Sequence, residues 1–140
     1  MHLLRDSLFY FDVRRSFALP KSNKLKSITA ITRLFDVGTS DFAYPIKLVF
    51  LKESVGEQFE TFKAGVSVPK KLYKKAVDRN TIKRRLREAI RLNQQGLYEY
   101  CLEHNCFFHF MLIYVGKEIL TSQQIDKSVR SLFEKLIKDA

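Results

Sequence analysis

The sequence has few glycines and prolines, which interrupt helices and strands, and few cysteines, which can form disulfides. Its 140 residues include five glycines, three prolines and two cysteines. Glycine and proline do not gather into a linker, so a single domain is predicted. The cysteines, Cys101 and Cys106, are too few for a disulfide framework, and reduced thiols of the cytosolic kind are expected.

Long apolar runs are also missing. No stretch approaches the roughly 18 residues needed to span a bilayer, and Arg5, Asp6 and Asp12 interrupt the N-terminal apolar residues, so no signal-peptide core forms. We expect residues 1–16 to be a poorly ordered leader and residues 17–140 to form the domain. A cytoplasmic protein with no membrane partner and no implied protein partner is predicted.

Acidic residues are scarce relative to basic ones. The chain has 15 Asp and Glu against 25 Lys and Arg, a net charge of +10. Residues 70–91 hold ten basic and two acidic side chains and so carry +8 of that excess. With 46% apolar residues the chain can bury a core, which excludes a solvated basic tail. A polyanion is the expected partner, and nucleic acid fits better than an acidic membrane surface.

The first half of the chain predicts a helix and two strands. After Pro20, apolar residues recur at three- and four-residue steps up to a terminating Gly38. Residues 46–52 and 58–68 are rich in strand-forming residues, and residues 54–57 are expected to join them as a hairpin turn. The apolar residues of the helix are Leu25, Ile28, Ile31, Leu34 and Phe35.

The second half predicts a helix over 76–93, a short helical patch around 97–102, a strand over 106–115 and a last helix. The strand is almost continuously apolar, as expected for burial on both faces. The last helix opens with Thr121-Ser122-Gln123-Gln124, a capping-box pattern. The predicted order is α-β-β-α-β-α, an α+β single-domain α-β sandwich.

The basic helix has one apolar side and one cationic side. At about 100° per residue, Ile82, Leu86, Ala89 and Ile90 share one arc. Arg79, Lys83 and Arg87 form a row spaced about 6 Å apart along the axis, suited to contacts with phosphates. Arginine matches two phosphate oxygens with a planar fork, whereas lysine acts as a point charge. Asn80 can contact a base edge, a ribose or a hydrated ion. The predicted RNA-binding residues are Arg79, Asn80, Lys83, Arg84, Arg87 and Arg91, with Lys70 and Lys71 before them.

The stretch GVSVPKKLYKKAVDRNTIKRRLREAIRLN resembles the signature of the bacterial ribonuclease P protein subunit. That family carries a strand ending in a Lys-Lys pattern, then Ala-Val, then R-N-x-x-K-R-x-x-R-E. The matching positions are Arg79, Asn80, Lys83, Arg84, Arg87 and Glu88. The similarity extends more weakly from Leu19 to the C-terminus.

The resemblance implies a fold like the second domain of a ribosomal small-subunit protein, with a left-handed β-α-β crossover. It implies two partners, a catalytic RNA and precursor tRNA, and a role as non-catalytic protein subunit of an endoribonuclease. The RNA would remove the 5′ leader with Mg²⁺, and no residue of the protein is assigned as a catalytic or metal-binding residue. The Arg-Asn-rich helix would grip that RNA.

The resemblance also implies a cleft for the single-stranded leader between the first helix and the sheet. Phe35 matches an aromatic of the family that stacks on a nucleotide. Ile31 and Val49 stand where other members often carry aromatics, which weakens the stacking surface. Plain core packing is the alternative for Phe35.

Other functions have less support. The four residues of the Cys101-x2-His104-x-Cys106-x2-His109 pattern could ligate zinc, but the spacing is too compact and a strand puts two of them on opposite faces. A protein nuclease would need carboxylates to hold metal ions, and the basic segment lacks them. An RNA-binding or ribosome-associated domain of similar fold is the alternative function. A DNA-binding helix lacks a helix-turn-helix partner or dimer zipper.

Overall fold

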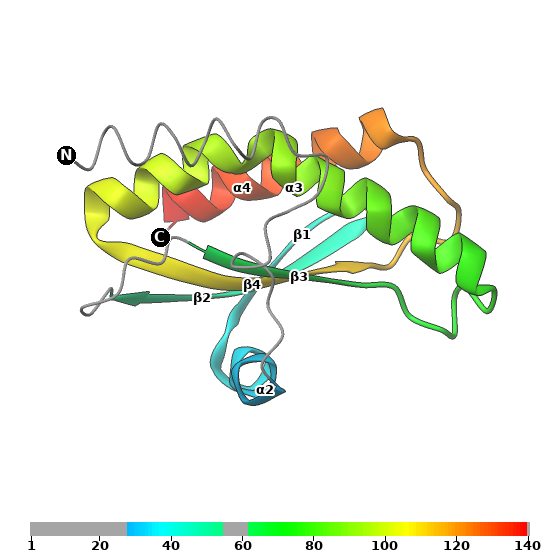
Figure 1. The fold of residues 1–140 in the computed structure, drawn as a ribbon, viewed down its shortest axis with the longest axis horizontal. Coiled ribbons are helices and arrows are strands. Elements are labelled where there is room, and N and C mark those ends of the chain that lie inside the picture. The colour runs from blue at the N-terminus through cyan, green and yellow to red at the C-terminus, as the bar shows by residue number, and fades with distance from the viewer. Residues whose placement is uncertain (1–27, 55–61, 140) are drawn as a thin grey trace.

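A computed structural model describes residues 28–54 and 62–139. Four strands form one sheet, and helices cover both of its faces (Figure 1). Helices α3 and α4 lie on one face and α2 lies on the other. The predicted leader, the start of the first helix and the centre of the 54–57 turn lie outside the described residues.

Helix α2 (Ile28–Val37) confirms the first predicted helix over its described part. It ends at Gly38, whose backbone N–H donates to the carbonyl of Leu34 at 2.8 Å. A β-carbon at this position would lie 2.2 Å from that carbonyl oxygen, so only glycine permits the tight exit.

The exit leads into a strand that the sequence pattern did not predict. Strand β1 (Thr39–Ala43) pairs antiparallel with β2 (Ile46–Ser54), from Thr39 opposite Phe50 to Ala43 opposite Ile46. Its sequence, TSDFA, is too polar to show the apolar alternation of a strand. β1 is therefore held by its hydrogen bonds to β2. The observed order has one more strand than the predicted α-β-β-α-β-α.

The prediction that residues 46–52 and 58–68 pair with each other as a hairpin is wrong. The sheet order is β1-β2-β4-β3, so β4 (Cys106–Tyr114) lies between β2 and β3 (Phe62–Ser67). β4 is antiparallel to β2 and parallel to β3. A strand this apolar is stable only with a partner on each edge and a cover on each face, and local spacing cannot indicate which strands supply them. β3, α3 and β4 form the crossover unit, whose left-handed sense stays a prediction.

Helix α3 (Ala76–His104) begins where predicted but is much longer than 76–93, because it includes the helical patch at 97–102. The polar run Asn93-Gln94-Gln95-Gly96 does not break it, since the buried side continues through Leu97 and Cys101. The helix ends at Asn105 in the left-handed conformation, with φ 49° and ψ 48°. Asparagine is one of the few residues that adopt this terminating geometry readily.

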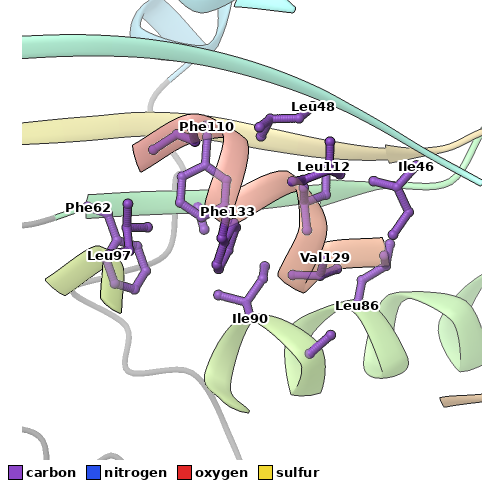
Figure 2. Close-up of a cluster of buried hydrophobic side chains, with 14 of the residues drawn as sticks. Ile46, Leu48, Phe62, Leu86, Ile90, Leu97, Phe110, Leu112, Val129 and Phe133 are labelled. Carbon is purple, nitrogen blue, oxygen red and sulfur yellow. The ribbon is translucent and has the colours of Figure 1, made fainter. Parts of the chain in front are cut away.

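Helix α4 (Ser122–Asp139) begins with the predicted capping box. The Gln124 backbone N–H donates to Thr121 Oγ1 at 3.2 Å, and the Thr121 N–H donates to Gln124 Oε1 at 3.0 Å. Its apolar stripe packs with α3 against the sheet, where Phe133 lies among side chains of both layers (Figure 2). The ring of Phe133 meets that of Phe110 edge-on, with centroids 5.4 Å apart.

A smaller apolar cluster lies on the opposite face of the sheet. Leu34 of α2, Val49 of β2 and Met111 of β4 are buried together, with Ile31 packed against them. β4 is therefore covered on both faces, as its apolar sequence predicted.

Candidate nucleic-acid interface

The N-terminal half of α3 presents the two sides that the helical spacing predicted. Ile82, Leu86, Ala89 and Ile90 are buried. The next arc of the helix carries the cations. Asn80, Arg84 and Arg87 are exposed, and Lys83 is half-buried. Within the described part of the chain, Lys83, Arg84 and Arg87 form no ion pair, so their charges face solvent uncompensated.

Arg79 opens this row but has a second role. Its Nη1 donates to the carbonyl of Tyr73 at 2.8 Å and to that of Lys74 at 2.9 Å. The guanidinium thus fastens the turn before α3 to the first turn of the helix. Its remaining N–H groups are left for a ligand, because a guanidinium carries five. Arg79 is therefore both a structural and a candidate binding residue.

Lys70 and Lys71 lie exposed in that turn. The turn is folded back on itself, since the N–H groups of Leu72 and Tyr73 both donate to the carbonyl of Pro69 at 3.2 Å. Tyr73 is its anchor: the side chain is buried, and its hydroxyl donates to the carbonyl of Gly116 at 2.7 Å. Burial raises the pKa of Tyr73 to about 12, and the neighbouring Tyr114 adds to the rise.

Two arginines of the basic segment are directed to partners within the protein. Arg91 is paired with Glu88 through Nη2–Oε1 at 2.5 Å and Nε–Oε2 at 3.1 Å, and its side chain is only 11% exposed. Glu88 therefore orients an arginine one turn along the helix, and the hydrogen bond from Arg91 lowers the pKa of Glu88. Arg85 Nη1 donates to the carbonyl of Leu120 at 2.6 Å and so ties α3 to the segment before α4. Arg91, one of the predicted RNA-binding residues, is thus held by a partner within the protein.

The predicted leader-binding residues divide into one open and two covered side chains. Phe35 is 50% exposed in the last turn of α2 and is not part of the apolar cluster beneath that helix. Ile31 packs on the cluster, and Val49 is 5% exposed within it. Val49 therefore supports α2 from below, and Phe35 is the one of the three with a ring open to a nucleotide.

Sequence reasoning did not single out the other side chains on this face. Positions alternate across a strand, so β3 directs Lys63 and Ser67 to the α2 side while β4 directs Phe107 and His109 there. These four residues are half-buried, and the rings of Phe107 and His109 lie 5.1 Å apart. The signal available in the sequence was the alternation of apolar with polar or small residues in Phe62–Ser67, but it is interpretable only once β4 is known to be the neighbour of this strand.

The fold does not gather the compact Cys/His pattern of the described residues into one metal-binding group. Cys101 and Cys106 are buried, and burial raises the pKa of both thiols. His104 stacks on Tyr100 with centroids 4.1 Å apart, and His109 lies against Phe107 on the other face of the sheet. Among residues 28–54 and 62–139, no group of three or more His, Cys, Asp or Glu side chains is placed to hold a metal ion. No helix in that described part is long and apolar enough to cross a bilayer.

A four-stranded sheet with an uncompensated cationic helix on one face defines a basic α+β domain whose surface suits a polyanion. A family model, Ribonuclease P, matches residues 19–137. The ribonuclease P protein component of Porphyromonas gingivalis is 28% identical over 117 residues, which is 82% of this chain and 83% of the relative. With a family match over most of its length, the chain belongs to the ribonuclease P protein family.

Solved structures show the same fold. The ribonuclease P protein of Staphylococcus aureus superposes with a TM-score of 0.63 at 23% identity, covering 83% of this chain and 96% of that one. The protein of Thermotoga maritima gives 0.62 at 20% identity, covering 80% and 96%. The sheet and helices described above are therefore those of a ribonuclease P protein.

Proposed function

We propose that this chain binds the catalytic RNA of ribonuclease P through the cationic arc of α3, and the 5′ leader of precursor tRNA on the α2 side of the sheet. The observation that carries the proposal is the set Lys83, Arg84 and Arg87 beside Asn80, in the order of the family motif, none of which forms an ion pair within residues 28–54 and 62–139. Uncompensated cations on one rigid helix repel one another, and a phosphate backbone supplies the missing counter-charge.

The chain would contribute binding and leave the hydrolysis to the RNA. Metal-dependent cleavage of a phosphodiester needs carboxylates grouped around the ions, and the described residues offer no such group. The only acidic side chains of the basic segment are Asp78 and Glu88, and Glu88 is held by Arg91. Mg²⁺ would therefore be bound by the RNA. The cytoplasm, where precursor tRNA is processed, is the proposed location.

The leader would lie on the opposite face of the sheet from α3. Phe35 offers an exposed ring at the end of α2, and a ring stacks on any base whatever its sequence. Phe107 and His109 lie on the same face. The two RNA molecules would therefore lie on different faces of one sheet, on the α3 side and on the α2 side (Figure 1).

Reconstitution tests the proposal. Full-length protein would be combined with the cognate catalytic RNA and a leader-bearing precursor tRNA over a range of Mg²⁺ concentrations. We expect the protein to lower the Mg²⁺ requirement for cleavage and to tighten binding of precursor over mature tRNA. A protein that changes neither quantity contradicts the proposal.

A matched pair of double variants separates the α3 surface from overall charge. Lys83→Ala with Arg87→Ala removes two cations from α3, and Lys127→Ala with Lys138→Ala removes two exposed cations from α4. We expect only the first pair to weaken binding of the catalytic RNA and to flatten its salt dependence, by about 0.7 to 0.9 per lost phosphate contact. Equal losses in both would indicate non-specific attraction.

A further inference from the structure

Three turns meet at one end of the sheet and are fastened to one another. They are the β1–β2 turn at 44–45, the β3–α3 turn at 69–75 and the β4–α4 turn at 115–121, and we call them the joined turns. The Val115 N–H donates to the carbonyl of Pro45 at 2.8 Å. The Tyr73 hydroxyl reaches the carbonyl of Gly116, so each turn is bonded to another.

Gly116 shows how closely these segments approach. A β-carbon on it would lie 2.7 Å from the Pro45 side chain and 3.2 Å from the ring of Tyr114. Tyr114 in turn donates to the carbonyl of Glu118 at 2.5 Å and accepts from the Leu120 N–H at 3.1 Å. The joined turns are thus a rigid surface that a ligand need not order, which favours binding.

Tyr44 stands out on this surface because it is exposed while the tyrosines beside it are buried. Its side chain is 55% exposed, whereas Tyr73 and Tyr114 are 7% and 0% exposed. Ser128 of α4 donates to the Tyr44 carbonyl at 2.8 Å, which holds this backbone on the α4 side of the sheet. Burial raises the pKa of both Tyr73 and Tyr114, and Tyr44 adds a smaller contribution to each rise.

The joined turns together are strongly positive. The joined turns carry five lysines and one acidic residue, Glu118. All five ammonium groups belong to exposed residues. A surface that combines an exposed ring with exposed cations can bind single-stranded nucleic acid, in which bases stack on the ring and phosphates meet the charges. The lysines are Lys70, Lys71, Lys74, Lys75 and Lys117.

We propose that the joined turns form a second RNA-binding surface, on which Tyr44 stacks on an unpaired base of the catalytic RNA and the lysines contact the adjoining phosphates. The inference rests on the proposed function. The catalytic RNA, not the leader, is the occupant because the surface is continuous with the cationic arc of α3: Arg79 of that arc is bonded to Tyr73 and Lys74 of the turn. Phe35 belongs to α2, and that helix lies on the other face of the sheet.

Tyr44→Ala tests the stacking directly, and Phe42→Ala is its matched control. Phe42 is 51% exposed and two residues away, but it lies in β1, outside the joined turns. Affinity for the catalytic RNA alone would be measured as a function of salt. We expect Tyr44→Ala to weaken binding about 5-fold or more without changing the salt slope, since stacking involves no counterion release. Tyr44→Phe and Phe42→Ala should stay within about twofold of the original protein.

Thermal unfolding shows whether Tyr44→Ala folds. If it does not, Lys117→Ala provides a second test of the inference. It should reduce the salt slope by about 0.7 to 0.9. Equal affinities of Tyr44→Ala and Phe42→Ala, or an unchanged slope for Lys117→Ala, would overturn the inference. Loss of precursor-over-mature discrimination with unchanged affinity for the catalytic RNA would also overturn it, by making the leader the occupant.

The α3 double variant distinguishes this failure from that of the proposed function. If Lys83→Ala with Arg87→Ala weakens binding while Tyr44→Ala does not, only the second surface is wrong. If the original protein does not bind the catalytic RNA at all, the proposed function itself fails.

Discussion

Leu34 and Phe35 are adjacent in the sequence and opposite in exposure. Leu34 is fully buried between α2 and the sheet, whereas Phe35 is half exposed. The sequence predicted both as apolar positions of one helix and could not separate them, because periodicity places a residue on an arc without showing how far a neighbouring strand covers it. Partners set the roles of Arg79 and Arg91 in the same way: one binds backbone carbonyls and the other binds Glu88. The motif gave the positions of these arginines but not the atoms they contact.

Phe35→Ala should separate leader recognition from stability. We expect it to reduce discrimination between long and short leaders while leaving affinity for the catalytic RNA within about twofold, because the ring is not part of the core. Leu34→Ala is the comparison and should lower the free energy of unfolding by about 2–5 kcal/mol. Denaturant unfolding and binding to precursors of graded leader length provide the measurements. If Phe35→Ala destabilises the fold as much as Leu34→Ala, its role is packing.

At the scale of the elements, the prediction was best where the determinant is local. The start of α3, its apolar side, the capping box of α4 and the doubly covered β4 follow from spacing and side-chain chemistry within one segment. β1 and the pairing of β2 with β4 were missed because they depend on segments far apart in the chain. The length of α3 was missed for a related reason. Its residues 93–96 are polar, and they stay helical because the residues of α3 before and after them are buried against the rest of the protein.

Within α3, Arg79 and Arg87 should behave differently when replaced. Arg87→Ala should reduce the salt slope of RNA binding by about 0.7 to 0.9 and leave stability within about 0.5 kcal/mol. Arg79→Ala should also weaken the fold, by roughly 1–3 kcal/mol, since two carbonyls lose a charged donor. Thermal unfolding without RNA and salt titration with RNA distinguish the two effects. Equal stability of the two variants would mean that the turn does not need Arg79.

At the scale of the whole molecule, the buried tyrosines predict a loss of stability in alkali. The folded protein keeps the Tyr73 proton until pH reaches about 12, whereas an unfolded tyrosine loses it near pH 10. The folded state therefore holds more protons between these values, and stability falls as pH rises through them. We expect Tyr73 to account for about 1–2 kcal/mol of that fall. Denaturant unfolding at pH 8 to 11 measures it, and Tyr73→Phe should flatten the curve. A steeper curve in that variant would contradict the assignment.

The strand order has a consequence for how the chain is made. β4 lies in the middle of the sheet yet is the last strand in the sequence. Until residues 106–114 have been synthesised, β2 and β3 lack β4, the strand that pairs with both of them. Their apolar faces are then accessible to other chains. The long basic helix is synthesised in that interval, between β3 and β4. We expect the positive charge of that helix to oppose association between unfinished chains until β4 completes the sheet.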